Sequence, residues 1–127
     1  MFASGSDDNT AILWSYNEEI GLFNPSEIKT ATKQISYLSF SEDGSKIVIS
    51  SKDGIIRVHD AKNSFLYSTL KGHTSFVNCA LFLNNGASAI SGSHDKTIKL
   101  WDVHYQKCVK TMLPGSSCNS IEILSEK

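Results

Sequence analysis

The stretch from Gly72 to Asp102 decides how this chain is organised. It opens with Gly72-His73 and closes with Ser91-Gly92-Ser93-His94-Asp95-Lys96-Thr97-Ile98-Lys99-Leu100-Trp101-Asp102. Between these ends lie a β-rich run from Val77 to Leu83, the turn signal Asn85-Gly86 and a second apolar run. Apolar runs of this length, separated by Asn-Gly and similar turn residues, are typical of antiparallel strands. The stretch therefore predicts one compact antiparallel unit.

The same pattern occurs three times. The segment that ends at Trp101 recurs 87 residues earlier, where it ends at Trp14, and the copy at Ile49 to Asp60 lies 42 residues before its counterpart. The first two copies are thus 45 residues apart and the second and third are 42 apart. Periods of 42 and 45 residues are typical of β-propeller blades. We therefore divide the chain into repeat one at 1–29, which lacks its first strand, repeat two at 30–71, repeat three at 72–113 and the start of a fourth repeat at 114–127.

The fold class that this pattern predicts is all-β, a partial propeller with about three blades' worth of four-stranded antiparallel sheets. No segment shows sustained 3.6-residue periodicity, so no long helix is expected. We expect strands near 18–23 and 119–124, and a loop around Asn24-Pro25-Ser26. Propellers typically contain four to eight blades. The chain is therefore expected to be part of a propeller, or an open arc that self-associates through its edges.

Composition excludes several classes of function. The chain has 127 residues, 40% of them hydrophobic, which suits a globular protein. Its net charge is −1 and it has no run of Lys or Arg, which argues against direct nucleic-acid binding. No apolar run is long enough to span a membrane. The cysteines at 79, 108 and 118 contain no C-x-x-C pair; reduced thiols are the favoured interpretation, and a metal site or disulfide is the alternative.

With three copies of the pattern in agreement, the chain resembles the WD40-repeat family. The resemblance implies a propeller that serves as a binding platform, usually without catalysis. It also implies a hydrogen-bond network in each repeat, which in repeat three would consist of His73, Ser93, Asp95 and Trp101. The corresponding residues are Ser6, Asp8 and Trp14 in repeat one, and Ser51 and Asp53 in repeat two, where His59 replaces the Trp.

This network leaves no residues for chemistry. It accounts for the spacing of His73 and Asp95 without a catalytic role. The remaining histidines lack the spacing of a metal site, and no phosphate-binding loop or Ser/His/Asp set is present. We therefore expect no catalytic residue, no metal and no cofactor.

A narrower resemblance is to the Smu-type family of spliceosomal WD40 proteins. It rests on Gly72 to Asn78, on His59 in place of a Trp one repeat earlier, on Leu38 to Ser41 and on Asn119 to Ile121. This resemblance implies a nuclear pre-mRNA splicing factor that binds the RED protein and other spliceosomal proteins. The alternative is a WD40 adaptor in another complex, in ubiquitin ligation, trafficking or signalling, with a cytoplasmic location.

The expected partner surface is the face where the turns and inter-blade loops gather. An apolar aromatic in a polar loop suits an interface hot spot, which makes Phe76 the strongest candidate, with inter-blade packing as the alternative. The other candidates precede a turn Asp or open a first strand: Asp7, Gln34, Lys52, Ser75 and His94.

Overall fold

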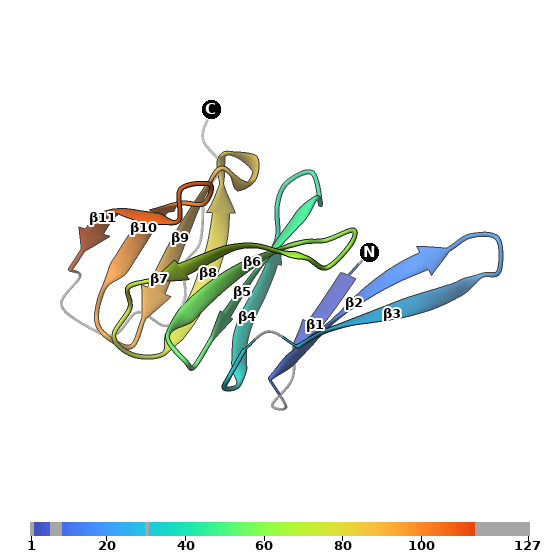
Figure 1. Ribbon diagram of the computed structural model, residues 1–127, viewed down its shortest axis with the longest axis horizontal. Helices are drawn as coiled ribbons and strands as arrows, with labels where there is room; N and C mark the ends of the chain where they lie inside the picture. The colour runs from blue at the N-terminus through green and yellow to red at the C-terminus, as the bar shows by residue number, and fades with distance from the viewer. Residues whose placement is uncertain (1, 6–8, 30, 114–127) are drawn as a thin grey trace.

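The computed structural model describes residues 2–5, 9–29 and 31–113. These residues form three antiparallel sheets that lie side by side in a row, as Figure 1 shows. The predicted all-β class, a partial propeller, is confirmed. The first sheet has the order β1-β2-β3, from β1 (Phe2–Gly5), β2 (Thr10–Asn17) and β3 (Leu22–Lys29).

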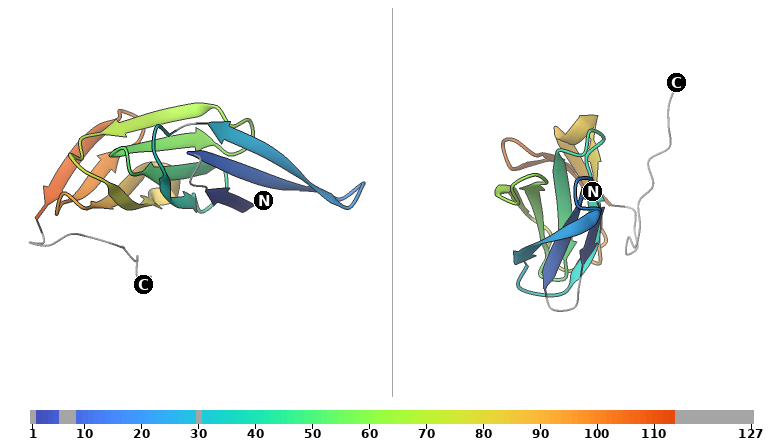
Figure 2. Two further views of the ribbon diagram at one scale, coloured as in Figure 1. Left: turned by 90° about the horizontal axis from the view of Figure 1, so that it is seen from below. Right: turned by 90° about the vertical axis from the view of Figure 1, so that its right-hand side faces the viewer.

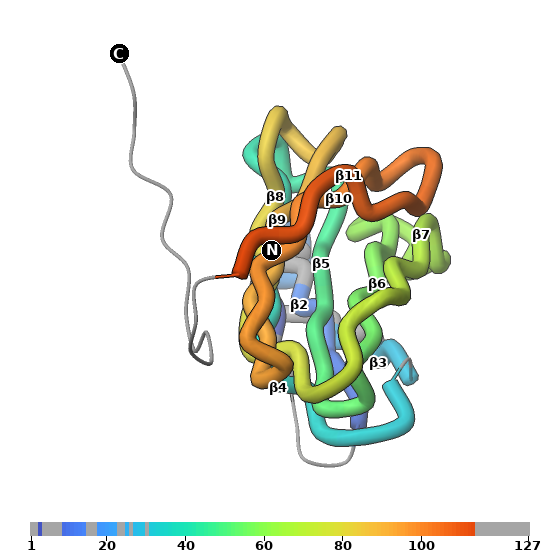
Figure 3. The backbone as a smooth tube through the Cα atoms, turned by 90° about the vertical axis from the view of Figure 1, so that its left-hand side faces the viewer, coloured from blue at the N-terminus to red at the C-terminus, as the bar shows by residue number. Residues whose placement is uncertain are grey.

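The second and third sheets are complete four-stranded units. The second runs in the order β4-β5-β6-β7 and consists of β4 (Ile35–Phe40), β5 (Lys46–Ser51), β6 (Ile55–Asp60) and β7 (Leu66–Lys71). The third likewise runs from β8 to β11, with a short 3-10 turn η1 (Asn84–Gly86) after its first strand: β8 (Val77–Leu83), β9 (Ser88–Ser93), β10 (Ile98–Asp102) and β11 (Lys107–Met112). The row curves into an arc (Figure 2), and its sheets stand one behind another when viewed along it (Figure 3).

The hydrophobic core lies between neighbouring sheets. The face of the second sheet contributes Val48, Ile56, Val58 and Leu70, and the third sheet packs Trp101 and four smaller residues against them. A second cluster joins the first and second sheets: Ala11, Leu13, Ile28, Ile35, Ile47 and Ile49. Each sheet is therefore stabilised by its neighbours, as expected for stacked repeats.

The first sheet differs from its prediction in one strand. The predicted strand at 18–23 and loop at 24–26 are wrong, because the turn lies at residues 18–21 and β3 runs through Pro25, opposite Trp14. Pro lacks an amide N–H and is tolerated on an edge strand, and β3 is the outer strand of this sheet. The extra residues of repeat one thus lengthen the β2–β3 hairpin, which extends from the row in Figure 1.

The structure describes two of the three cysteines. Cys79 is buried and Cys108 is exposed. Cys118 and the expected strand at 119–124 lie outside the described residues. Within the described ranges, no helix is both long enough and apolar enough to cross a membrane.

Candidate functional site

A chain of hydrogen bonds links the two ends of repeat three. The Trp101 indole donates to Ser91 Oγ over 2.8 Å, and Ser91 Oγ lies 2.7 Å from His73 Nε2. His73 Nδ1 lies 2.8 Å from Asp95 Oδ2, which also accepts the Thr74 amide over 3.0 Å. The network thereby ties the loop before β8 to the β9–β10 turn.

Burial and hydrogen bonding set the charges in this network. Burial of the imidazole lowers the pKa of His73, and the hydrogen bond to Asp95 offsets only part of this effect. Burial opposes ionisation of Asp95, but hydrogen bonds from Thr97, His73 and the Thr74 amide outweigh it and hold the pKa of that carboxyl well below its usual range. At neutral pH a neutral His73 therefore donates from Nδ1 to a carboxylate and accepts at Nε2 from the Ser91 hydroxyl.

The prediction that Ser93 joins Trp101 and His73 is wrong, because Ser91 occupies that place. Trp101 lies opposite Ala89 in the β9–β10 register. At about 3.3 Å per residue, Ser91 is about 7 Å along the strand from that point and Ser93 about 13 Å, which is beyond the reach of the indole. Ser93 Oγ instead donates to the Phe76 carbonyl over 2.7 Å and accepts the Asp95 amide.

The glycine before His73 is required by close packing. A Cβ added to Gly72 would lie 3.0 Å from Cη2 of Trp101. The Gly-His pair therefore has two separate roles, since the glycine makes room for the indole and the histidine joins the network.

Repeat two holds its turn carboxylate by other means. Ser91 and Trp101 correspond to Ile49 and His59, so the Trp–Ser hydrogen bond of the network is lost. Asp53 Oδ2 instead accepts from Thr32 N and Thr32 Oγ1, each over 3.0 Å, and forms an ion pair with Arg57 Nη1 at 2.9 Å.

Ser51 and Asp53, the predicted network members of repeat two, contact each other. Asp53 Oδ1 accepts the Ser51 hydroxyl and the Ile55 amide. Burial opposes ionisation of Asp53, but the bonds from Ser51, Thr32, Ile55 and Arg57 outweigh it and lower its pKa to about 2. Arg57 was missed from the sequence. The available signal was a cation four residues after the turn Asp, across a tight turn.

His59 lies in the position that Trp101 occupies one repeat later. It is 5% exposed, and its Nδ1 lies 3.0 Å from the Ser64 carbonyl oxygen. Burial lowers the pKa of His59, and the nearby Arg57 charge lowers it further, while the bond to Ser64 raises it. His59 is therefore neutral at pH 7 and serves as a packed side chain.

The structure brings two of the predicted partner residues into direct contact. Phe76 is 43% exposed, and its ring stacks on that of the exposed His94 with centroids 5.8 Å apart and an interplanar angle of 29°. The His94 amide donates to the Phe76 carbonyl over 2.9 Å, which fixes the two backbones together. The pair forms an aromatic surface where β8 begins and β9 ends.

The corresponding residues of repeat two are held in the same way. The Lys52 amide donates to the Gln34 carbonyl over 2.9 Å. Gly54, at φ +83°, would place a Cβ 3.1 Å from the Ser75 carbonyl oxygen, so the turn of one blade touches the loop of the next. Gln34, Lys52, Ser75, Phe76 and His94 therefore lie at one end of the blades, and we call these five residues the loop face.

The remaining predicted residues belong to repeat one. Ser6, Asp7 and Asp8 lie outside the described residues. Trp14 is half-buried in β2. Among the residues that the structure describes, no three His, Cys, Asp or Glu side chains gather as a metal site would require.

Comparison with known proteins identifies the family. The family described as "WD domain, G-beta repeat" matches residues 25–60 and 64–102, more than half of the chain. The chain belongs to the WD40-repeat family. Members of this family are typically non-catalytic scaffolds for protein interaction.

Relatives of this WD40 chain have diverse names. It is 32% identical to "Protein tipD" of Dictyostelium discoideum over 124 residues, covering 98% of the chain and 20% of the relative. It is 28% identical to "Autophagy-related protein 16" of Arabidopsis thaliana over 120 residues, covering 93% and 23%. It is also 28% identical to "Probable coatomer subunit beta'" of Schizosaccharomyces pombe over 112 residues, covering 87% and 14%. The chain thus spans less than a quarter of each of these relatives.

Proposed function

We propose that this chain is a non-catalytic scaffold that binds a protein partner through the loop face. The stacked Phe76–His94 pair carries the proposal, because it exposes a rigid aromatic surface in an otherwise polar loop. Aromatic residues held by their surroundings lose little entropy on binding and are enriched among interface hot spots. Lys52 and Gln34 provide polar contacts beside this surface.

The assembly to which the scaffold belongs is a separate step of the proposal. The names of two relatives, autophagy-related protein 16 and a coatomer subunit, favour an adaptor in autophagy or trafficking, in the cytoplasm. A spliceosomal scaffold in the nucleus, with RED-like partners, is the second candidate. It is supported by His59 in place of Trp together with Ser75 to Asn78.

Affinity purification followed by quantitative mass spectrometry tests both steps. The wild-type chain should recover one set of proteins above background, either autophagy and coat components or splicing components. Phe76→Ala should weaken recovery of that set by about thirtyfold if Phe76 is a hot spot. Leu22→Ala is the matched control, because it truncates an exposed apolar side chain on the β2–β3 hairpin. Equal recovery with both variants would exclude the loop face as the binding surface.

A further inference from the structure

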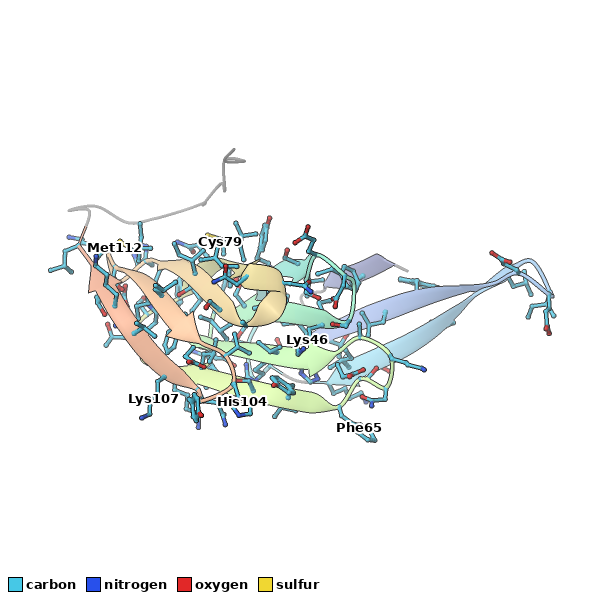
Figure 4. The ribbon with its side chains drawn as sticks, turned by 90° about the horizontal axis from the view of Figure 1, so that it is seen from above. Lys46, Phe65, Cys79, His104, Lys107 and Met112 are labelled. Carbon is cyan, nitrogen blue, oxygen red and sulfur yellow. The ribbon has the colours of Figure 1, made fainter. Side chains whose placement is uncertain are left out.

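A depression of about 440 Å³ lies at the opposite end of the blades from the loop face. It occupies the seam between the second and third sheets. Lys46 and Tyr67 line one side, and residues 85–88 together with 102, 104 and 105 line the other. Figure 4 looks onto this end of the molecule and labels Lys46 and His104, which come from the two different sheets. The volume of the depression is in the range of pockets that hold small ligands or a peptide side chain.

Lys46 brings a positive charge to this depression. Its side chain is half-buried at the start of β5, and its ammonium group lies 5.0 Å from the centre of the Tyr67 ring. Lys46 forms no ion pair with another residue that the structure describes. The ring satisfies one side of the ammonium, which leaves its other donors available to a ligand.

His104 adds a second donor beside the first. Tyr67 Oη lies 3.3 Å from His104 Nδ1, and the Tyr105 ring meets the imidazole edge-on at 4.9 Å. When Tyr67 Oη donates to Nδ1, Nε2 of the imidazole carries a hydrogen that can donate to a ligand. The Tyr67 side chain thus contacts both the Lys46 ammonium and the His104 imidazole.

Tyr67 and Tyr105 line the depression beside these donors, together with polar residues that include one acid, Asp102. Phe65, Leu66, Tyr67 and Tyr105 are between 46% and 72% exposed, and they account for four of the ten large hydrophobic side chains exposed in the described part of the chain. Asp102 also lines the depression, with Oδ1 accepting the Tyr105 amide over 3.0 Å. A dianionic phosphate would meet this like charge, so a single carboxylate matches the site better.

We propose that this depression binds the carboxylate of an Asp or Glu side chain in a partner polypeptide, flanked by apolar residues. The Lys46 ammonium and His104 Nε2–H bind the carboxylate oxygens, and Tyr67 and Tyr105 pack against the neighbouring apolar side chains. The partner is thus an acidic peptide segment with hydrophobic neighbours. Since the site lies at the end opposite to the loop face, the chain would carry two separate interaction surfaces.

The test is a titration of the ¹⁵N-labelled 127-residue chain, followed by NMR, with two capped peptides. Acetyl-Leu-Glu-Phe-amide should give saturable shifts of the amides at residues 46, 67, 104 and 105. The Gln analogue, which has the same shape without the charge, should bind about fivefold more weakly, as expected for loss of an exposed ion pair. Inorganic phosphate at the same concentration should give smaller shifts than the Glu peptide.

Three variants make the result specific. Lys46→Met keeps the aliphatic stem and should weaken binding of the Glu peptide about fivefold. Lys71→Met, also on an exposed part of the second sheet, should leave it unchanged. Phe76→Ala should also leave it unchanged, which separates this site from the loop face. Equal binding of the Glu and Gln peptides, or unaltered binding by Lys46→Met, would overturn the proposal, and equal shifts with phosphate would overturn the carboxylate assignment.

Discussion

Replacing Ser91 by alanine should destabilise repeat three far more than the loss of one hydroxyl suggests. Ser91 is fully buried and connects two groups, the Trp101 indole N–H and His73 Nε2. Trp101 is 1% exposed and the His73 side chain is enclosed, so water cannot replace the hydroxyl. A buried polar group left without its hydrogen-bond partner costs about 1–3 kcal/mol, and two of them predict a loss of about 2–6 kcal/mol.

A double-mutant cycle isolates the part of this loss that involves the indole. Trp101→Phe removes the N–H donor, so Ser91→Ala in that background leaves only His73 Nε2 without its hydrogen-bond partner. The cost of Ser91→Ala should therefore fall by about 1–3 kcal/mol in the Phe background. Ser93→Ala breaks the bond to the Phe76 carbonyl, which Trp101 does not share. Its cost should be additive with Trp101→Phe to within about 0.5 kcal/mol.

Urea unfolding followed by far-UV circular dichroism measures all of these variants without depending on Trp101 fluorescence. Ser88→Ala is the matched control, because it truncates a half-buried serine of the same strand, and its cost should be within about 0.5 kcal/mol of zero. Coupling of Trp101 to Ser93 with none to Ser91 would refute the assignment of the network.

Three further perturbations test the other supports of the blades. Arg57→Met should cost about 3 kcal/mol in urea unfolding, because it leaves the Asp53 carboxylate without its cation; a loss below about 0.5 kcal/mol would contradict this role. The lowered pKa of His59 means that the unfolded chain binds its proton more readily, so stability should fall as pH drops below about 6.5, and less steeply in His59→Phe. Gly72→Ala should lower the free energy of unfolding by about 1–3 kcal/mol, since its Cβ would press on Trp101; an unchanged free energy of unfolding would show that the indole can move.

The features that sequence could predict are those with local signals. The 42-residue period and the Asn-Gly and Asp-Gly turns predict the sheets of repeats two and three, because hairpin turns depend on a few adjacent residues. The Phe76–His94 contact was within reach for the same reason, since both residues flank strands that pair next to each other. Local chemistry therefore supplied the architecture and the loop face.

The features that sequence could not predict depend on register across strands. Ser91 and Ser93 have the same spacing pattern, and only the pairing of Trp101 with Ala89 shows which hydroxyl the indole can reach. Pro25 was interpreted as a loop residue, because its tolerance at a sheet edge depends on which strand is outermost. In both cases the decisive information is which residue lies opposite which.

The turn carboxylate is the part of the network that repeats two and three both keep. Repeat two has lost the Trp, the Ser and the His, yet Asp53 Oδ2 still binds the loop before its first strand through Thr32, as Asp95 Oδ2 does through Thr74. Arg57 supplies the partner that His73 supplies in repeat three. This anchor fixes the end of the blade where the loop face lies. A repeat can therefore lose its Trp, fill the space with His59, and still hold its loop-face residues in register with the next blade.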